Sequence, residues 1–219
     1  MSLWLELLPQ LSSGLGMTLR LLAVAMPLGL LVGTLVGTAR VYGPWPLRAV
    51  AGIYQSVFRG VPLVVQLFVL YYALPRAGVL LSPFTAATLG FALCSGAYHS
   101  EYIRSAISSI SRGQMEAARA VGMSRGQAIR TIILPQALRR AVPGCGNELV
   151  YLVKYSSLAY LVTLVDLMGA GRIEANASFR FFETFLVVGT IYLLMVSILR
   201  AVLHVVQRAW RRSSVGLGV

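Results

Sequence analysis

Long uncharged apolar runs, separated by short arginine-rich connections, constrain the fold of this chain more than any other feature of its sequence. The clearest run covers residues 21–39 and is bounded by Arg20 and Arg40. A helix needs about 20 mainly apolar residues to cross a bilayer. Only 12% of the residues are charged, against roughly 25% in soluble domains. The pattern therefore predicts an all-α integral membrane protein.

Five runs of this kind predict five transmembrane helices. The expected spans are residues 15–39, 54–74, 83–107, 147–168 and 184–206. The segments between them are too short for a separate soluble domain. We therefore expect one transmembrane domain over residues 1–219.

The distribution of arginine predicts the orientation in the membrane. Basic residues gather in the 40–48 connection, in residues 111–140 and in the tail at 208–212. The N-terminus, the turn at Arg76 and the 169–183 connection carry few. Because short cytoplasmic loops are enriched in Lys and Arg, we expect the N-terminus outside and the C-terminus in the cytoplasm.

Glycines recur at four-residue spacing in the first span, at Gly29, Gly33 and Gly37. Small residues at this spacing let two helices approach closely. The pattern favours packing within the chain, and a dedicated dimer interface is the alternative.

The polar, basic segment 111–140 is predicted to fold as two short helices. Ser111 with Gln114, and Ser124 with Gln127, both match the capping-box pattern. In that pattern a serine hydroxyl and a glutamine side chain satisfy the free amide groups at a helix start. Each serine is therefore expected to begin a helix.

The turn between these helices is predicted at Gly122, which suits a left-handed C-terminal cap. Pro135 lies far enough into the second helix that it should kink or end it. Ala117 and Ala118 form a small face that would let a partner surface approach closely.

Two other interpretations of this segment are open. Residues 117–124 also resemble a helix-turn-helix, the unit that places a second helix in the major groove of DNA. Such a unit needs a supporting soluble domain, and here apolar runs flank it, so we expect no nucleic-acid partner. A basic segment can also simply lie on anionic lipid.

Ionisable residues at membrane depth are candidates for a translocation path, because an unpaired charge there is costly. Glu101 and Arg104 share a helix face with Tyr98. The candidate path residues are Tyr98, Glu101, Arg104, Arg59, Lys154 and Asp166. Their charges could converge from neighbouring spans. Alternatively they pair with each other or extend toward the cytoplasmic ends.

Beyond these patterns, stretches along nearly the whole chain resemble one family. The stretches are residues 14–19, 58–68, 71–75, 96–104, 113–118 and 147–158. They are similar to permease subunits of bacterial ATP-driven importers for histidine, arginine, glutamine and glutamate. Two motifs differ from the common pattern: Val61 stands where threonine is more frequent, and Tyr155-Ser156 stands where aspartate-threonine is. These differences bear on the substrate rather than on the family.

The resemblance implies a type I importer permease in the bacterial inner membrane that moves polar or charged amino acids. It implies that a cytoplasmic loop docks on a separate ATPase. The coupling residues would be Glu116, Ala117, Ala118, Gly122, Leu134 and Pro135. It further implies two ATPase subunits, an identical or related second permease, and an extracytoplasmic amino-acid-binding protein. The chain itself would bind no cofactor, since ATP and Mg²⁺ would be bound by the ATPase.

Two functions of other classes compete with this one. A lipid-modifying membrane enzyme would need a catalytic or metal cluster, and the only histidines are His99 and His204. The phosphate-binding Gly-x-x-x-x-Gly-Lys loop is absent. A channel or secondary transporter would not explain an ordered pair of cytoplasmic helices.

Overall fold

The computed structural model describes the backbone of residues 2–215 and the side chains of residues 7–208, and within this part the fold is entirely helical. The α-helices are α1 (Ser2–Tyr42), α2 (Trp45–Gly60), α3 (Leu63–Phe68), α4 (Pro83–Ser108), α5 (Arg112–Ala120), α6 (Arg125–Ala128), α7 (Leu134–Tyr155), α8 (Leu167–Ser178) and α9 (Phe181–Val215). Tighter or wider helical turns extend some of them: π-helix at Val69–Ala73 and Ile129–Ile133, and 3₁₀-helix at Leu74–Ala77 and Ser156–Val162. The all-α prediction is confirmed for the described residues.

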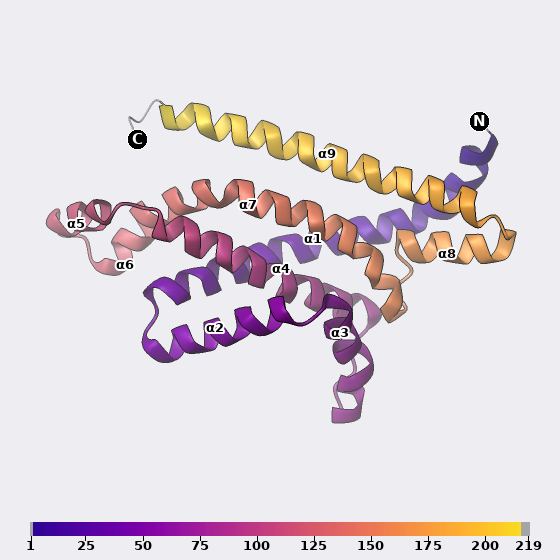
Figure 1. Ribbon diagram of the computed structural model, residues 1–219, viewed down its shortest axis with the longest axis horizontal. Coiled ribbons are helices and arrows are strands. Elements are labelled where there is room, and N and C mark those ends of the chain that lie inside the picture. Colours follow the sequence, from indigo (N-terminus) through magenta and orange to yellow (C-terminus); the bar gives the residue numbers. More distant parts are fainter. Residues whose placement is uncertain (1, 216–219) are drawn as a thin grey trace.

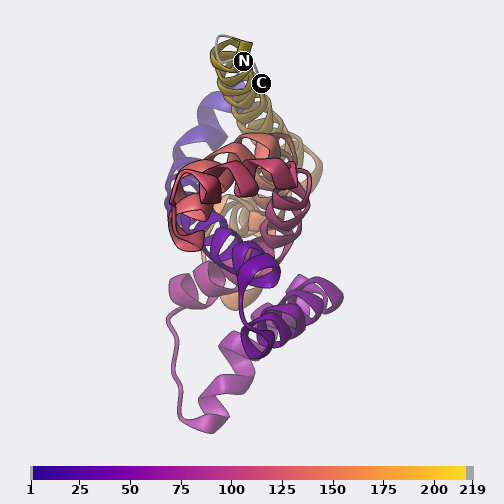
Figure 2. The same ribbon diagram turned by 90° about the vertical axis from the view of Figure 1, so that its left-hand side faces the viewer.

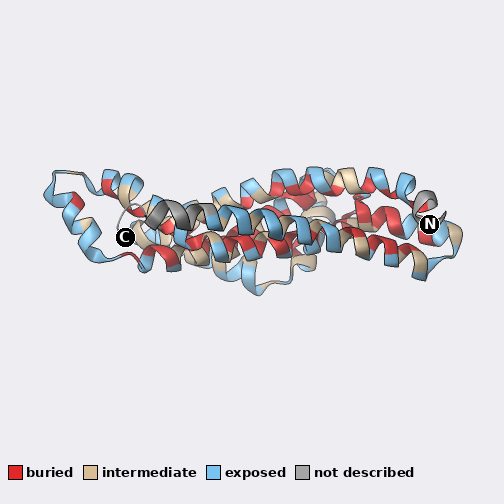
Figure 3. Cartoon of the chain, turned by 90° about the horizontal axis from the view of Figure 1, so that it is seen from above, coloured by how far each residue is buried: buried red, intermediate tan, exposed pale blue. Residues whose placement is uncertain are grey.

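Four long helices, α1, α4, α7 and α9, run along the long axis of the molecule (Figure 1). Helix α4 packs against α1 and α7, and α9 packs against α7. Buried residues follow the facing sides of the long helices (Figure 3). Helices α5 and α6 close one end, and α8 lies at the other. The α2–α3 arm projects from the side of this bundle (Figure 2).

The glycines of α1 lie in its contact with α4. A Cβ at Gly33 would overlap His99, and one at Gly37 would lie 2.7 Å from the carbonyl oxygen of Ser100. Gly29 meets the same face of α4. Because only glycine allows this approach of the two backbones, the prediction of packing within the chain is confirmed.

The predicted span 54–74 is wrong as one continuous helix, because α2 and α3 meet at an angle of 105°. Val61 between them is extended, as expected for a residue before a proline, and Pro62 has no amide to continue the helix. The amide of Gln66 then donates to the carbonyl oxygens of Phe58 at 3.0 Å and Val61 at 2.8 Å. The side chain thereby satisfies backbone groups that the break sets free.

The predicted span 147–168 also does not coincide with one helix. Its helix begins earlier, at Leu134, and continues to Val162 as a 3₁₀ turn. Thr163 then takes a left-handed conformation with φ 62°, and α8 starts after Asp166 at an angle of 56° to the preceding helix. A single hydrophobic stretch in the sequence thus contains a sharp bend.

Two helices are long and apolar enough to cross a membrane, Leu7–Tyr42 and Phe181–Arg208, or up to four if each bent pair counts as one span. These two include the first and fifth predicted runs. Helix α4 matches the predicted third run closely, although it is not among the helices that pass this test. The structure therefore gives two to four candidate spans among its described residues. The count of five stays a prediction.

Candidate functional site

Helix α5 begins at Ser111, but the predicted capping box does not form there. The hydroxyl of Ser111 accepts from the amide of Gly113 at 3.3 Å rather than from that of Gln114. The side chain of Gln114 instead accepts from the amide of Gln136, at 3.3 Å, in α7. The Gln114 side chain therefore contacts α7 instead of capping its own helix, and this bond joins the first turn of α5 to the first turn of α7.

Helix α6 begins with the predicted capping box. The amide of Gln127 donates to the hydroxyl of Ser124 at 3.2 Å, and the amide of Ser124 donates to the Gln127 side chain at 2.8 Å. Pro135 does not end the helical run. The π-helical turn Ile129–Ile133 precedes it, so that the chain passes directly into α7. Such a wider turn accommodates a proline by shifting the hydrogen-bond pattern.

Gly122 forms the turn between α5 and α6, with φ 87°. The amide of Met123 donates to the carbonyl of Ala118, and that of Gly122 to the carbonyl of Arg119, both at 3.1 Å. This pair of bonds is the Schellman motif, in which a left-handed residue closes a helix. The left-handed cap predicted at Gly122 is confirmed.

The remaining coupling residues differ in exposure. Glu116, Ala117 and Pro135 are exposed and Leu134 is half-buried, whereas Ala118 is only 6% exposed. The expected two-alanine face is wrong, because successive residues of a helix point about 100° apart. Only Ala117 faces outward, and Ala118 anchors α5 to the protein.

This helical hairpin is held firmly to the end of the bundle. The guanidinium of Arg125 lies 5.7 Å from the ring centre of Tyr42, the last residue of α1. Arg140 of α7 donates to the carbonyl of Ser109, the C-cap of α4, at 2.7 Å, and so holds together the two long helices that the hairpin connects. Helix α6 is four residues long and runs on into α7. It therefore does not stand free as a helix-turn-helix recognition helix would.

Glu101, the first of the path candidates, is held by two arginines. Arg40 of α1 donates to one carboxylate oxygen at 2.6 Å, and Arg104 donates through Nε to the other at 3.0 Å. The sequence pattern identified Arg104 as a neighbour but not Arg40, which it treated as the basic end of a span. The carboxylate thus joins α1 and α4 near the α5–α6 end.

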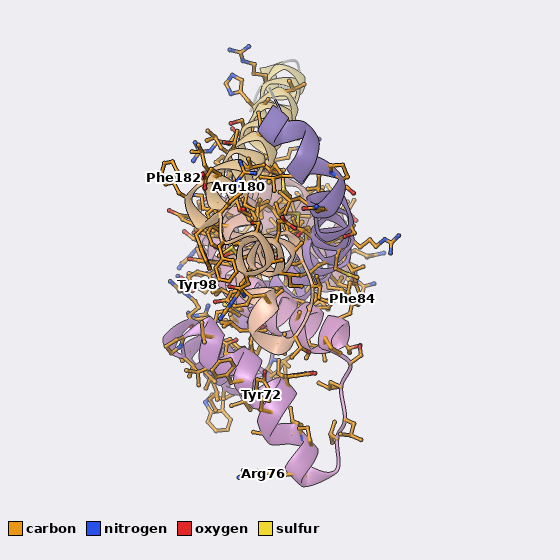
Figure 4. All side chains as sticks on the ribbon, turned by 90° about the vertical axis from the view of Figure 1, so that its right-hand side faces the viewer. Tyr72, Arg76, Phe84, Tyr98, Arg180 and Phe182 are labelled. Atoms are coloured by element: carbon orange, nitrogen blue, oxygen red, sulfur yellow. The ribbon has the colours of Figure 1, made fainter. Side chains whose placement is uncertain are left out.

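Arg59 and Tyr98 come together in a separate place. The guanidinium of Arg59 lies 5.0 Å from the ring centre of Tyr98. Both line a cavity of about 380 Å³ beside the α2–α3 break, together with Cys94 and Tyr155. Tyr98 lies where the α2–α3 arm meets the bundle (Figure 4). The cavity therefore has a guanidinium from α2, on Arg59, and phenol side chains from α4 and α7, on Tyr98 and Tyr155.

Glu148 of α7 is a buried carboxylate that the sequence prediction missed. It is 4% exposed and lies within electrostatic range of Arg59, Cys94 and Tyr155. The predicted start of the fourth span, at residue 147, put Glu148 at a helix end. Since α7 begins at Leu134, Glu148 is instead in the middle of a helix and faces the bundle.

Lys154 and Asp166 do not join the other charges. Lys154 is exposed, with its ammonium 5.3 Å from the ring centre of Tyr151. Asp166 is fully buried as the N-cap of α8: it accepts from the amide of Gly169 at 2.9 Å and from the hydroxyl of Tyr192 at 3.3 Å. Of the six path candidates, the structure therefore forms two separate pairs, Glu101 with Arg104 and Arg59 with Tyr98.

Within residues 7–208, no group of three His, Cys, Asp or Glu side chains could hold a metal ion. His99 is buried between α1 and α4, and neither of its ring nitrogens has a hydrogen-bond partner. Cys94 and Cys145 are both free and buried.

Known proteins resemble the chain over nearly its whole length. A probable amino-acid ABC transporter permease protein, PatM of Vibrio harveyi, is 42% identical over 90% of both chains. The glutamine transport system permease protein GlnP of Escherichia coli K12 is 37% identical over 92% of this chain and 93% of GlnP. Both relatives are named as permease proteins, PatM of an amino-acid ABC transporter and GlnP of a glutamine transport system.

Solved structures agree with this fold. A chain from the crystal structure of an amino acid ABC transporter with histidines aligns with a TM-score of 0.85 and 34% identity, covering 94% of this chain and 96% of that one. A chain of the inward-facing MetNI methionine ABC transporter aligns with a TM-score of 0.69 over 93% and 95% of the two chains. At 22% identity, that second likeness concerns the fold alone.

The model of a protein family described as the inner membrane component of binding-protein-dependent transport systems matches residues 25–212. That match takes in the second half of α1, the whole of α4 and α7, most of α9, the α2–α3 arm and the α5–α6 hairpin. The chain belongs to this family of inner membrane transport components.

Proposed function

We propose that the chain is the permease subunit of an ATP-driven importer of polar or charged amino acids. The relatives carry names that include glutamine and arginine transport. In this proposal the permease forms the translocation pathway and performs no chemistry. A separate ATPase binds and hydrolyses ATP with Mg²⁺, and an extracytoplasmic binding protein delivers the substrate.

The proposed topology has five membrane segments: α1, the α2–α3 arm, α4, α7 and α9. The α1–α2 connection, the α5–α6 hairpin and the late part of α9 lie at one end of the bundle (Figure 1). The N-terminus and the α7–α8 and α8–α9 connections lie at the other. The arginine-rich connections thus share one end, which supports a cytoplasmic C-terminus and an external N-terminus. Arg211 and Arg212, which entered this argument, have side chains outside the described part.

The α5–α6 hairpin carries the coupling proposal. It is a capped, exposed helical pair at the arginine-rich end, in contact with α1 through Arg125 and with α7 through Gln114. A rigid projection of this kind transmits the movement of a bound ATPase to the long helices. Glu116, Ala117, Gly122 and Pro135 would lie at the contact, and Ala118 and Leu134 would support it from the inner side.

A second permease subunit is proposed to pack on the α2–α3 arm. The arm leaves the bundle and exposes apolar side chains along α2, including Val50, Ile53 and Val57. Helix α9 also exposes leucines and isoleucines, and we expect this second apolar surface to face lipid rather than protein. A cysteine at Ile53 is therefore expected to form a crosslink between two permease subunits, whereas one at Leu194 of α9 is not.

We propose that the substrate passes through the cavity beside Arg59 on its way across this subunit. A guanidinium suits the carboxylate of an amino acid, because the pair forms charge-assisted hydrogen bonds. Buried Glu148, which is within electrostatic range of Arg59, would balance the amino group. Substitution Arg59→Gln is expected to lower uptake more than Lys154→Gln, since Lys154 does not line the cavity.

Ligand-stimulated ATP hydrolysis tests the proposal as a whole. The permease would be purified together with its candidate ATPase and placed in proteoliposomes with the binding protein. Hydrolysis is expected to rise only when binding protein and a polar amino acid are both present. Uptake driven by an ion gradient, without any associated ATPase, would instead identify a secondary transporter.

A further inference from the structure

A groove of about 450 Å³ lies between the last turns of α1 and the helical run that follows Ser124. Leu35, Ala39 and Tyr42 form its α1 wall, and Ile129, Arg130 and Leu134 form the other. It is distinct from the cavity beside Arg59, since the two share no lining residue. The Arg125 guanidinium, held over the ring of Tyr42, is next to it.

The two walls of the groove have different chemistry. The α1 wall belongs to a helix that is long and apolar enough to span a membrane. The opposite wall belongs to the basic segment 111–140, and Arg130 is its one charge among Gly126, Ile129 and Leu134. The groove therefore places a single cation beside largely apolar walls, as the space beside a lipid headgroup does.

Arg130 is the one charged residue that lines the groove. Arg130 is exposed and forms no ion pair with any described residue. None of the residues that line the groove is acidic. Arginine forms strong, charge-assisted hydrogen bonds with phosphate oxygens. The missing partner of this surface is thus an anion.

We propose that this groove binds one anionic phospholipid, with its phosphate at Arg130 and its acyl chain along Leu35 and Ala39. A free anion would use the arginine but would leave the apolar wall exposed. A loop of the ATPase would have to reach past the hairpin to a wall formed by a membrane helix. A phospholipid in the bilayer would contact both walls, with its phosphate at Arg130 and its acyl chain on the α1 wall.

The experiment counts the lipids that remain bound to the purified permease complex. The complex would be extracted from vesicles of equal parts phosphatidylcholine and phosphatidylglycerol and measured by native mass spectrometry. Arg130→Gln is expected to lower the ratio of retained phosphatidylglycerol to phosphatidylcholine about fivefold, the effect of one charge near an anionic surface. Leu35→Trp, which fills the groove without altering charge, is expected to lower total retained lipid.

Matched controls separate the groove from general surface charge. Arg139 is also exposed but lies outside the groove, and Leu31 is exposed one turn earlier on α1. Arg139→Gln and Leu31→Trp should both retain lipid as the parent does. If Arg139→Gln matches Arg130→Gln, or if neither lowers the ratio, the groove is not a lipid site.

Two further measurements distinguish a lipid from a free anion or a segment of the ATPase in the groove. Displacement of the lipid by inorganic phosphate alone would identify a general anion site and overturn the proposal. A photo-crosslinker at Leu35 should label lipid, whereas labelling of the ATPase would assign the groove to that subunit. The measurements need neither ATP nor substrate. Their outcome is therefore independent of whether the proposed transport function holds.

Discussion

Gly122 is the residue on which the α5–α6 hairpin depends most directly. Its φ of 87° is a conformation that side chains with a Cβ resist. No atom lies within 4 Å of the place where a Cβ would be added. Within this chain, a substitution there would act only through backbone strain, because the added side chain meets no other atom.

Gly122→Val is therefore expected to open the turn, at a cost of about 1–2 kcal/mol. The protein should insert into the membrane normally but lose association with the ATPase and coupled uptake. Gly122→Asn is the control, because asparagine tolerates the left-handed conformation. Co-purification of the ATPase measures both, and full retention with valine would refute the docking role of this turn.

The ion pair between Arg40 and Glu101 gives a second prediction at this scale. Both side chains are partly exposed, so Glu101→Gln should cost only about 1–2 kcal/mol of stability. Arg40→Gln should cost a similar amount, and the double variant less than the sum. Thermal unfolding of the three variants measures this coupling. Additive losses would mean that the contact contributes nothing.

Individual residues show why sequence patterns found only part of the site. Gly122 was predictable because its role is local and depends on its own backbone. Glu148 was not, since its burial depends on where α7 begins, well before the apolar run. Asp166 was assigned to the path by its charge, yet it caps α8, a role that requires knowledge of the bend before it.

At the scale of elements, the sequence predicted where apolar helices lie but not where they bend. Helix α4 ends within one residue of its predicted bounds, 83–107, because serine and proline mark its start. The predicted span 54–74 included the break at Val61 and Pro62, because two residues hardly change the mean hydropathy of a run of about 20. The sequence also gives no sign that Gln66 would stabilise that break from the following helix.

Gln66→Leu is expected to destabilise the α2–α3 arm. It removes the donor to two backbone carbonyls while it keeps a side chain of similar size. Loss of such buried bonds costs about 1–3 kcal/mol. Gln55→Leu in α2, where the glutamine has no such bonds, is the matched control. Proteolysis at the α2–α3 connection should increase only in the first variant, and equal protection would contradict this role.

The whole molecule places its basic and its neutral connections at opposite ends of a long bundle. Seen from the α8 end, Arg180 and Phe182 mark the start of α9, while Tyr72 and Arg76 lie out along the arm (Figure 4). The predicted orientation would put the basic end of the bundle in the cytoplasm.

Reporter fusions and labelling test that orientation. A reporter after Arg212 should behave as cytoplasmic, and one in the 169–183 connection as external, following the arginine bias. A cysteine that replaces Glu174 should react with an impermeant reagent added from outside. Reaction only from the cytoplasmic side would reverse the topology.

The glycine contact between α1 and α4 has a mechanical consequence. Side chains that fit into gaps on a facing helix resist both separation of the two helices and sliding along their axis. At Gly29, Gly33 and Gly37, α1 has no side chain, and Ser95, His99 and Ile103 of α4 lie against the gaps that these glycines leave. The Arg40–Glu101 ion pair joins the same two helices nearer the α5–α6 hairpin. A force applied by an ATPase to the hairpin would therefore move α1 and α4 together, as one unit.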